Sequence, residues 1–297
     1  MRIPRAVLMA VLAMVAGLTG CFSTTRVVQK TQAPETYRTA GVEQLEKEVS
    51  DRDVAIRTLN AQVLVTASTG GSRTGTVTEY TSFRGYIFVQ KPASLRVILQ
   101  LPVLGSRALD MVSDGKTFTL VRSTKSLGDV WMQGSNQVTK PSKNGLENLR
   151  PPVFLDSLLV PGVQAGEFVT LTESTRVTQE ATKHHDAIEE PDYDLTVLKP
   201  KSGNIMQRER TIHISRVTML PFQQDIYDDK GQMVTQATYE KYQQSAGQMF
   251  PALVTIRRPL EQYSLKIEVT KLTLNEMFDA DQFELKIPPG VTVQKMD

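Results

Sequence analysis

Four side chains of the types that bind metal ions gather in one short segment: His184, His185, Asp186 and Glu189. Successive side chains of an extended segment point to opposite sides, so the two adjacent histidines cannot easily share one ion. Only one further histidine, His213, is present in the chain. We therefore interpret the segment 179–194 as an exposed acidic loop or hairpin tip, and the sequence predicts no metal and no cofactor.

Catalysis by a serine or cysteine nucleophile requires a recognisable setting, and the sequence offers none. Ser72, which follows Gly70 and Gly71, lacks the strand-to-helix context of a nucleophile elbow. The phosphate-binding patterns G-x-G-x-x-G and G-x-x-x-x-G-K-[ST] do not occur. Glu189 and Glu190 lie in a polar segment rather than in the apolar cleft that acid–base catalysis by paired carboxylates needs. The sequence therefore predicts no catalytic residues and a protein that is not an enzyme.

The chain holds one cysteine, Cys21, which excludes an internal disulfide and any zinc site built on a CxxC pair. Before it lie two arginines, Arg2 and Arg5, and then an uncharged, mostly apolar stretch over 6–17. This layout is typical of a secretory signal peptide. The stretch is shorter than the roughly 20 residues that a membrane-spanning helix needs. We expect residues 1–20 to be a signal peptide that is removed.

The segment Leu18-Thr19-Gly20-Cys21 matches the lipobox of bacterial lipoproteins at every position. The resemblance implies that the Cys21 thiol receives a diacylglycerol and that its new amine is acylated, with palmitate as the expected acyl group. Two or three acyl chains hold a protein on a membrane stably, whereas one holds it only marginally. Phe22 stands where an aspartate retains lipoproteins in the inner membrane of enteric bacteria. We therefore expect a cell-envelope protein, anchored by lipid to the outer membrane and facing the periplasm.

The overall composition excludes several other classes. With 40% hydrophobic and 22% charged residues, the chain of 297 residues is ordinary for a globular protein. Its 34 basic and 32 acidic residues give a formal charge of +2, and the surplus is Arg2 and Arg5, which leave with the signal. No block of lysine and arginine occurs, so nucleic acid is not an expected partner.

Two segments follow the cysteine before the first strand signal. Residues 21–38 are polar and without periodicity, and we interpret them as a flexible tether from lipidated Cys21. Apolar residues then recur at roughly helical spacing over Val42–Leu59, with charged residues between them. This pattern predicts one amphipathic helix, either continuous or interrupted near Ser50.

Strand patterns dominate the rest of the chain. Leu95, Val97 and Leu99 alternate with polar residues, and similar short runs recur both before this stretch and over 211–270, separated by turn-forming residues. About ten strands without helices between them favour an antiparallel sheet, as a sandwich or an open barrel. Leu149–Val160 is the exception, because Pro151-Pro152 followed by apolar residues predicts a short helix.

The turn from Leu101 to Ser106 is unusually apolar, because turn tips are normally polar. Leu101, Val103 and Leu104 stand beside proline and glycine at the end of a strand. The turn could fold back onto the core. Alternatively, it could protrude and touch a membrane or a lipid, since exposed apolar groups mark interaction sites.

Several of these motifs resemble the LolA/LolB family of outer-membrane lipoprotein-sorting proteins. The similar stretches are a strand at Leu95–Leu99, the turn Pro102–Ser106, the turn Asp114–Lys116 and the C-terminal Phe283–Val291. The resemblance implies a mainly β (α+β) fold: a half-open antiparallel β-barrel of about ten strands with an N-terminal helix and a short helical lid. It also implies an apolar cavity for acyl chains under that lid. The candidate lid residues are Phe154, Leu155, Leu158 and Leu159.

The resemblance also suggests how the protein acts. In LolB a leucine on the protruding turn is important for inserting lipoproteins, and Leu104 stands at that place here. We therefore expect residues 39–297 to be a LolA/LolB-like domain that binds lipid or lipoprotein acyl chains, with a role in lipoprotein sorting or insertion and a periplasmic carrier protein as a partner. The alternative is a regulatory or scaffolding lipoprotein on the same fold, similar to RseB-like stress sensors. Extra sequence over 137–191 departs from the family pattern.

Overall fold

A computed structural model describes residues 26–28, 30–102, 105–124, 128–137, 149–183, 185–279 and 281–296. The chain divides into two compact units. One consists of Met1–Ala33 with Val177–Glu189, and the other of Pro34–Arg176 with Glu190–Asp297. Each unit is described by itself below.

In the smaller unit the acidic residues of the expected loop are paired. The short strand β1 (Thr31–Gln32) runs parallel to the first residues of β10 (Ala187–Ser202). Asp186 forms an ion pair with Lys30 at 2.8 Å, and Glu189 accepts a hydrogen bond from the Thr31 hydroxyl at 2.9 Å. The expectation of a loop over 179–194 is therefore wrong from residue 187 onward, where the chain is a strand.

The larger unit is built on one long sheet. Its path runs through β10, β11 (Ile205–Ser215), β12 (Pro221–Tyr227), β13 (Met233–Ser245), β14 (Gln248–Arg258), β15 (Tyr263–Leu274), β2 (Thr58–Gly71), β4 (Phe83–Gln90), β5 (Ser94–Gln100), β6 (Arg107–Ser113), β7 (Thr117–Thr124), β8 (Gly128–Ser135) and β16 (Val293–Met296). Neighbours along this path are antiparallel, except that β16 runs parallel to β8. The strands β3 (Thr76–Glu79) and β9 (Phe168–Gln179) pair with β2 and β10 beside the path. A single open antiparallel sheet, rather than a sandwich, is the architecture.

The strand count differs from the expectation of about ten, because the described residues contain sixteen strands. β10 alternates at Tyr193, Leu195 and Val197, but its acidic start was interpreted as a loop. Other strands that the sequence did not predict lack a clean alternation of polar and apolar residues. For example, β9 is threonine-rich and remains exposed or half-buried along its whole length. Main-chain hydrogen bonds to β10 hold it in the sheet, and of its residues only Val169 and Leu171 pack, partly buried, against apolar core residues.

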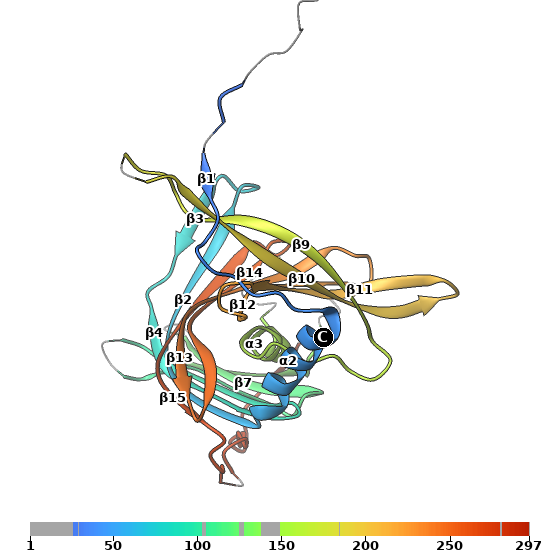
Figure 1. The fold of residues 1–297 in the computed structure, drawn as a ribbon. Helices are drawn as coiled ribbons and strands as arrows, with labels where there is room; N and C mark the ends of the chain where they lie inside the picture. The colour runs from blue at the N-terminus through green and yellow to red at the C-terminus, as the bar shows by residue number, and fades with distance from the viewer. Residues whose placement is uncertain are drawn as a thin grey trace, which may run out of the picture. The chain divides into compact units, whose positions relative to one another are not determined.

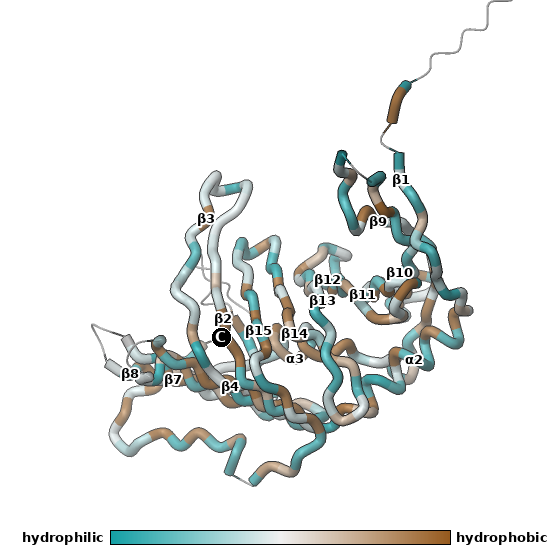
Figure 2. Tube along the Cα trace, turned by 60° about the vertical axis from the view of Figure 1, so that its left-hand side comes forward, coloured by the Kyte–Doolittle hydropathy of each residue, from teal (hydrophilic) through white to brown (hydrophobic). Residues whose placement is uncertain are grey.

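The sheet of the larger unit curves strongly, and two helices lie on its concave side (Figure 1). Alternate residues of each strand face this side; in β2, for example, Leu59, Ala61, Val63 and Val65 are all at most 3% exposed. Figure 2 shows the resulting alternation of apolar and polar residues along the strands. No helix within the described ranges is both long enough and apolar enough to span a membrane.

The first helix, α2 (Val42–Ala55), packs Leu45 and Val49 against apolar residues of β10 and β11. It is continuous through Ser50 but ends earlier than the sequence predicted. Ile56 already has extended backbone angles, and Leu59 belongs to β2, where it begins the two-residue alternation of that strand. Ile56 and Leu59 are three residues apart, which is a helical spacing. However, Ile56 follows the end of α2 and Leu59 lies at the start of β2.

The chain after β15 crosses the convex side before it returns to the sheet edge. Phe278 packs edge-on against Phe88 of β4 at a ring distance of 5.8 Å. Arg96 of β5 donates a hydrogen bond to the Gln282 carbonyl at 2.9 Å. These contacts fix the path that brings β16 alongside β8, where its residues can reach the concave side.

Candidate functional site

A cavity of about 480 Å³ lies between the concave face of the sheet and the helix α3 (Pro151–Leu158). Apolar side chains from β2, β4, β5, β6, β7, β8, β15 and β16 line it, together with Leu149 and Phe154. Among the described residues in this lining, only Arg122 and Gln294 are polar. The volume lies within the range of roughly 300–1,000 Å³ that is usual for ligand pockets.

The pairing of the strands explains why the lining is apolar. Leu99 stands opposite Leu109 on β6, and Leu109 stands opposite Arg122 on β7. These three residues form one row of cross-strand partners. In the neighbouring row, Leu120 stands opposite Met132 on β8. Because inward and outward positions alternate along each strand, every second residue of these strands faces the cavity. A cavity lined in this way favours an apolar occupant.

The short helix α3 begins with proline, as the sequence predicted, and divides the space inside the curved sheet. Phe154 is 1% exposed and faces the cavity of 480 Å³. Leu158 and Leu159 instead line a small pocket of about 50 Å³ beside Tyr239 and Tyr242. Leu155 is partly buried against the apolar residues of the concave face. Of the four candidate lid residues, Phe154 is therefore the one that lines the larger cavity.

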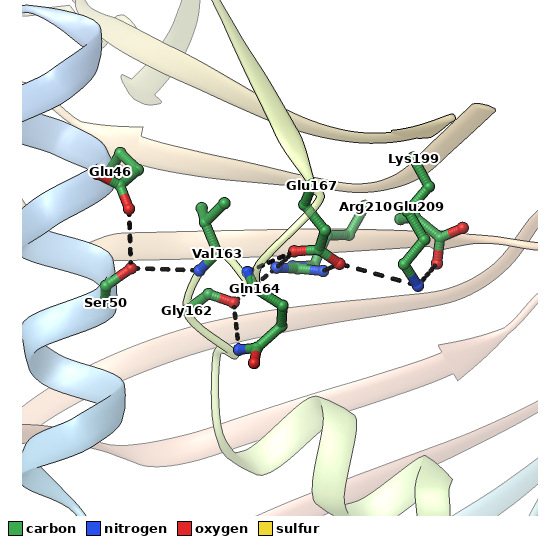
Figure 3. A network of polar contacts seen from close by, with 9 residues as sticks. All are labelled: Glu46, Ser50, Gly162, Val163, Gln164, Glu167, Lys199, Glu209 and Arg210. Atoms are coloured by element: carbon green, nitrogen blue, oxygen red, sulfur yellow. Dashed lines mark hydrogen bonds and ion pairs between the residues drawn. The ribbon is translucent and has the colours of Figure 1, made fainter. Parts of the chain in front are cut away.

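A network of polar contacts holds the segment that follows α3 (Figure 3). The Val163 amide donates to the Ser50 hydroxyl of α2 at 3.2 Å, and Arg210 of β11 donates to the Gly162 carbonyl at 2.8 Å. Arg210 also pairs with Glu167 at 2.9 Å. A side chain at position 162 would lie 2.9 Å from the Ser50 Cα, so this close approach requires glycine.

The charge state of this network is well defined. Burial alone would raise the pKa of Glu167, but the hydrogen bond from Arg210 and the positive charges of Arg210 and Lys199 outweigh it and lower the pKa. Glu167 is therefore ionised at neutral pH, and its pair with Arg210 is fully charged. The segment after α3 is thus fastened both to α2 and to the sheet.

A second cavity, of about 670 Å³, lies on the other side of α3 and is polar. Arg150, Asp156, Arg258 and Glu261 are among its lining residues. Withdrawal from bulk water raises the pKa of Asp156 to about 6, although Arg210 and Arg258 act in the opposite direction. Charged walls make this cavity a poor site for an alkyl chain, in contrast to the first.

The apolar turn between β5 and β6 is described only in part. Its ends are joined by hydrogen bonds from the Leu101 amide to Ser106 at 2.9 Å and from the Gly105 amide to Leu101 at 3.0 Å. Leu101 is 37% exposed. Val103 and Leu104 lie outside the described residues, as do Cys21 and His184.

The remaining histidines have structural partners. His213 lies between Asp194 at 2.6 Å and Asp225 at 3.2 Å, on the convex side of the sheet. Burial would lower the pKa of His213, but its hydrogen bonds to Asp225 and Asp194 raise it. Both ring nitrogens are engaged, so neither is free to take a proton from a substrate.

His185 contacts the Asp186 carbonyl at 3.2 Å. In the part of the chain that the structure describes, no group of three or more metal-ligating side chains could hold an ion.

Sequence reasoning missed most of the residues that line the apolar cavity. The alternation along β5 placed Leu99 on the apolar face of that strand, and the same alternation along β6 could have revealed Leu109 and Met111 as inward-facing. Gln294 and Met296 could not have been found in this way, because β16 joins the sheet edge after a long connection without periodicity.

No protein-family model matches the chain, and no curated protein matches it. Among solved structures, it is similar to a DUF1329 family protein from Desulfovibrio piger, at 14% identity over 82% of this chain and 95% of that one, with a TM-score of 0.45. A LolA superfamily protein from Nitrosomonas europaea gives 12% identity over 81% of this chain and 97% of that one, with a TM-score of 0.47. A putative outer membrane lipoprotein-sorting protein domain from Vibrio parahaemolyticus gives 9% identity over 82% of this chain and 94% of that one, with a TM-score of 0.46. One of these structures is described as a LolA superfamily protein, the group that the sequence motifs resemble.

Proposed function

We propose that this protein binds an alkyl chain of a lipid in the apolar cavity between the sheet and α3. The observation that carries the proposal is the cavity itself, with its volume of about 480 Å³ and its almost wholly apolar lining. Each methylene group moved from water into such a site contributes ~0.8 kcal/mol. An acyl chain therefore gains enough free energy for tight binding without any catalytic group.

The proposed setting is the periplasmic face of the outer membrane. It rests on the lipobox at Leu18–Cys21 and on Phe22, and it makes residues 21–38 the tether of a lipid-binding domain over 39–297. At this place the protein would receive acyl chains from a periplasmic carrier and act in lipoprotein sorting or insertion. The turn at Leu101, Val103 and Leu104 would then contact the membrane, and α3 would act as the lid of the cavity.

Lipid extraction tests the binding proposal. The mature chain from residue 21, made without its signal and hence unacylated, is incubated with vesicles of bacterial lipid and recovered by gel filtration. Mass spectrometry of the recovered protein should detect close to one lipid per chain. Recovery of the folded protein without lipid would contradict the proposal, and a protein partner found by cross-linking would then favour the regulatory alternative.

A further inference from the structure

One charged side chain faces the apolar cavity. Arg122 of β7 is the only charged residue among the described residues that line it, and it is partly buried. Its Nε atom is buried and makes no hydrogen bond. Within the described parts of the chain, no carboxylate lies within ion-pair distance of its guanidinium.

Two arginines on the neighbouring strands β5 and β6 are paired with carboxylates, unlike Arg122. Arg96 makes two hydrogen bonds to Asp110, at 3.1 and 3.0 Å. Arg107, on the strand next to β7, pairs with Asp129. A buried Nε atom without an acceptor is unfavourable, because the desolvation of that atom is not compensated. An anionic group on a bound ligand would supply the missing partner.

The position of Arg122 gives the cavity a polar end. Arg122 belongs to the row that contains Leu99 and Leu109, which is the row nearest the turn at 101–106. Leu120 and Met111 lie one row further from that turn and are apolar, and the uncharged Gln294 of β16 stands in that row beside Met132. A chain with its head at Arg122 would thus have its tail among apolar side chains and its head beside the turn.

We infer that the ligand is an anionic amphiphile, whose carboxylate or phosphate pairs with Arg122 while its alkyl chain fills the apolar part of the cavity. This inference rests on the proposed function and specifies the chemical class of the ligand. An acyl chain linked through a neutral ester or amide offers only a carbonyl oxygen, whereas a fatty acid or a phospholipid offers a full negative charge. Arginine binds both carboxylate and phosphate through paired donors.

Three twelve-carbon ligands separate the head group from the chain: laurate, dodecyl phosphate and dodecanol. Their dissociation constants are measured at pH 8 on the unacylated mature chain, on Arg122→Gln and on Arg84→Gln. Arg84 is the matched control, because it is an exposed arginine on β4 that does not line the cavity. We expect the wild-type chain to bind at least one of the two anions tenfold to a hundredfold more tightly than dodecanol, the range of a charge-assisted hydrogen bond. Arg122→Gln should remove this preference, so that the anions and dodecanol bind with similar affinity, whereas Arg84→Gln should keep it.

The two anions distinguish a carboxylate ligand from a phosphate ligand. Equal affinity of the wild-type chain for dodecanol and both anions would overturn the inference while leaving the proposed function intact. A preference that persists in Arg122→Gln would also overturn it. Failure of all three ligands to bind would instead contradict the proposed function. If Arg122→Gln does not fold, Arg122→Lys should retain a preference for anions, and its loss there would count against the inference.

Discussion

Replacing Ala67 with tryptophan is expected to abolish tight binding of an alkyl chain while the protein remains folded. Ala67 lies on β2 and lines the cavity of about 480 Å³, so the indole ring would occupy the space that the proposed ligand needs. If the ring displaces roughly five methylenes, at ~0.8 kcal/mol each, the loss is about 4 kcal/mol, or ~10³ in the dissociation constant. Calorimetric titration of the unacylated mature chain with laurate measures this change directly.

The matched control for this variant is Gln62→Trp. Gln62 lies on the same strand but is exposed on the opposite face, where a tryptophan would stand beside Tyr86 of β4. This variant should bind laurate as the wild-type chain does. Circular dichroism should show that both variants keep the β-sheet signal. Unchanged affinity in folded Ala67→Trp would mean that the ligand binds elsewhere.

Replacing Cys21 with serine is expected to release the protein from the membrane. The serine hydroxyl would not receive the diacylglycerol that the lipobox implies, so all the acyl chains would be lost together. Each chain contributes ~0.8 kcal/mol per buried methylene, and two or three chains are what make such an anchor stable. Fractionation of cells should therefore show nearly all of the variant in the soluble envelope fraction and nearly all of the wild-type protein with the membranes.

Ser23→Ala serves as the control for the anchor, because it changes the same polar segment and leaves the lipobox intact. It should fractionate with the membranes like the wild-type protein. If Cys21→Ser also remained with the membranes, the lipid anchor would not be what attaches this protein.

Much of the architecture follows from two simple sequence patterns. Alternation along segments such as Leu95–Leu99 predicted strands, and the absence of helices between them predicted a mainly antiparallel sheet; both predictions are confirmed. The proline pair before Val153 predicted α3, because proline fits the first turn of a helix. These features depend on local chemistry and on burial of one face, which sequence patterns record directly.

Other features depend on contacts between distant parts of the chain and could not be predicted. The strand β9 packs only Val169 and Leu171 partly against the core, and its place in the sheet comes mainly from its pairing with β10. The cavity depends on where α3 lies within the curve of the sheet, and that position is held by Arg210 and Ser50 through the segment around Gly162. Arg122 lies two residues after Leu120 on β7 and therefore shares its face, but only the structure shows that this face borders an apolar cavity.

The central claim, that an alkyl chain occupies the cavity, is tested most directly by NMR of methionine methyl groups. Met111, Met132 and Met296 line the cavity, whereas Met277 is 98% exposed and serves as an internal control. With laurate added to methyl-labelled unacylated mature chain, nuclear Overhauser effects should join the ligand methylenes to the Met111 and Met132 methyl groups and not to Met277. Saturable laurate binding without any such effect at Met111, Met132 or Met296 would contradict the account.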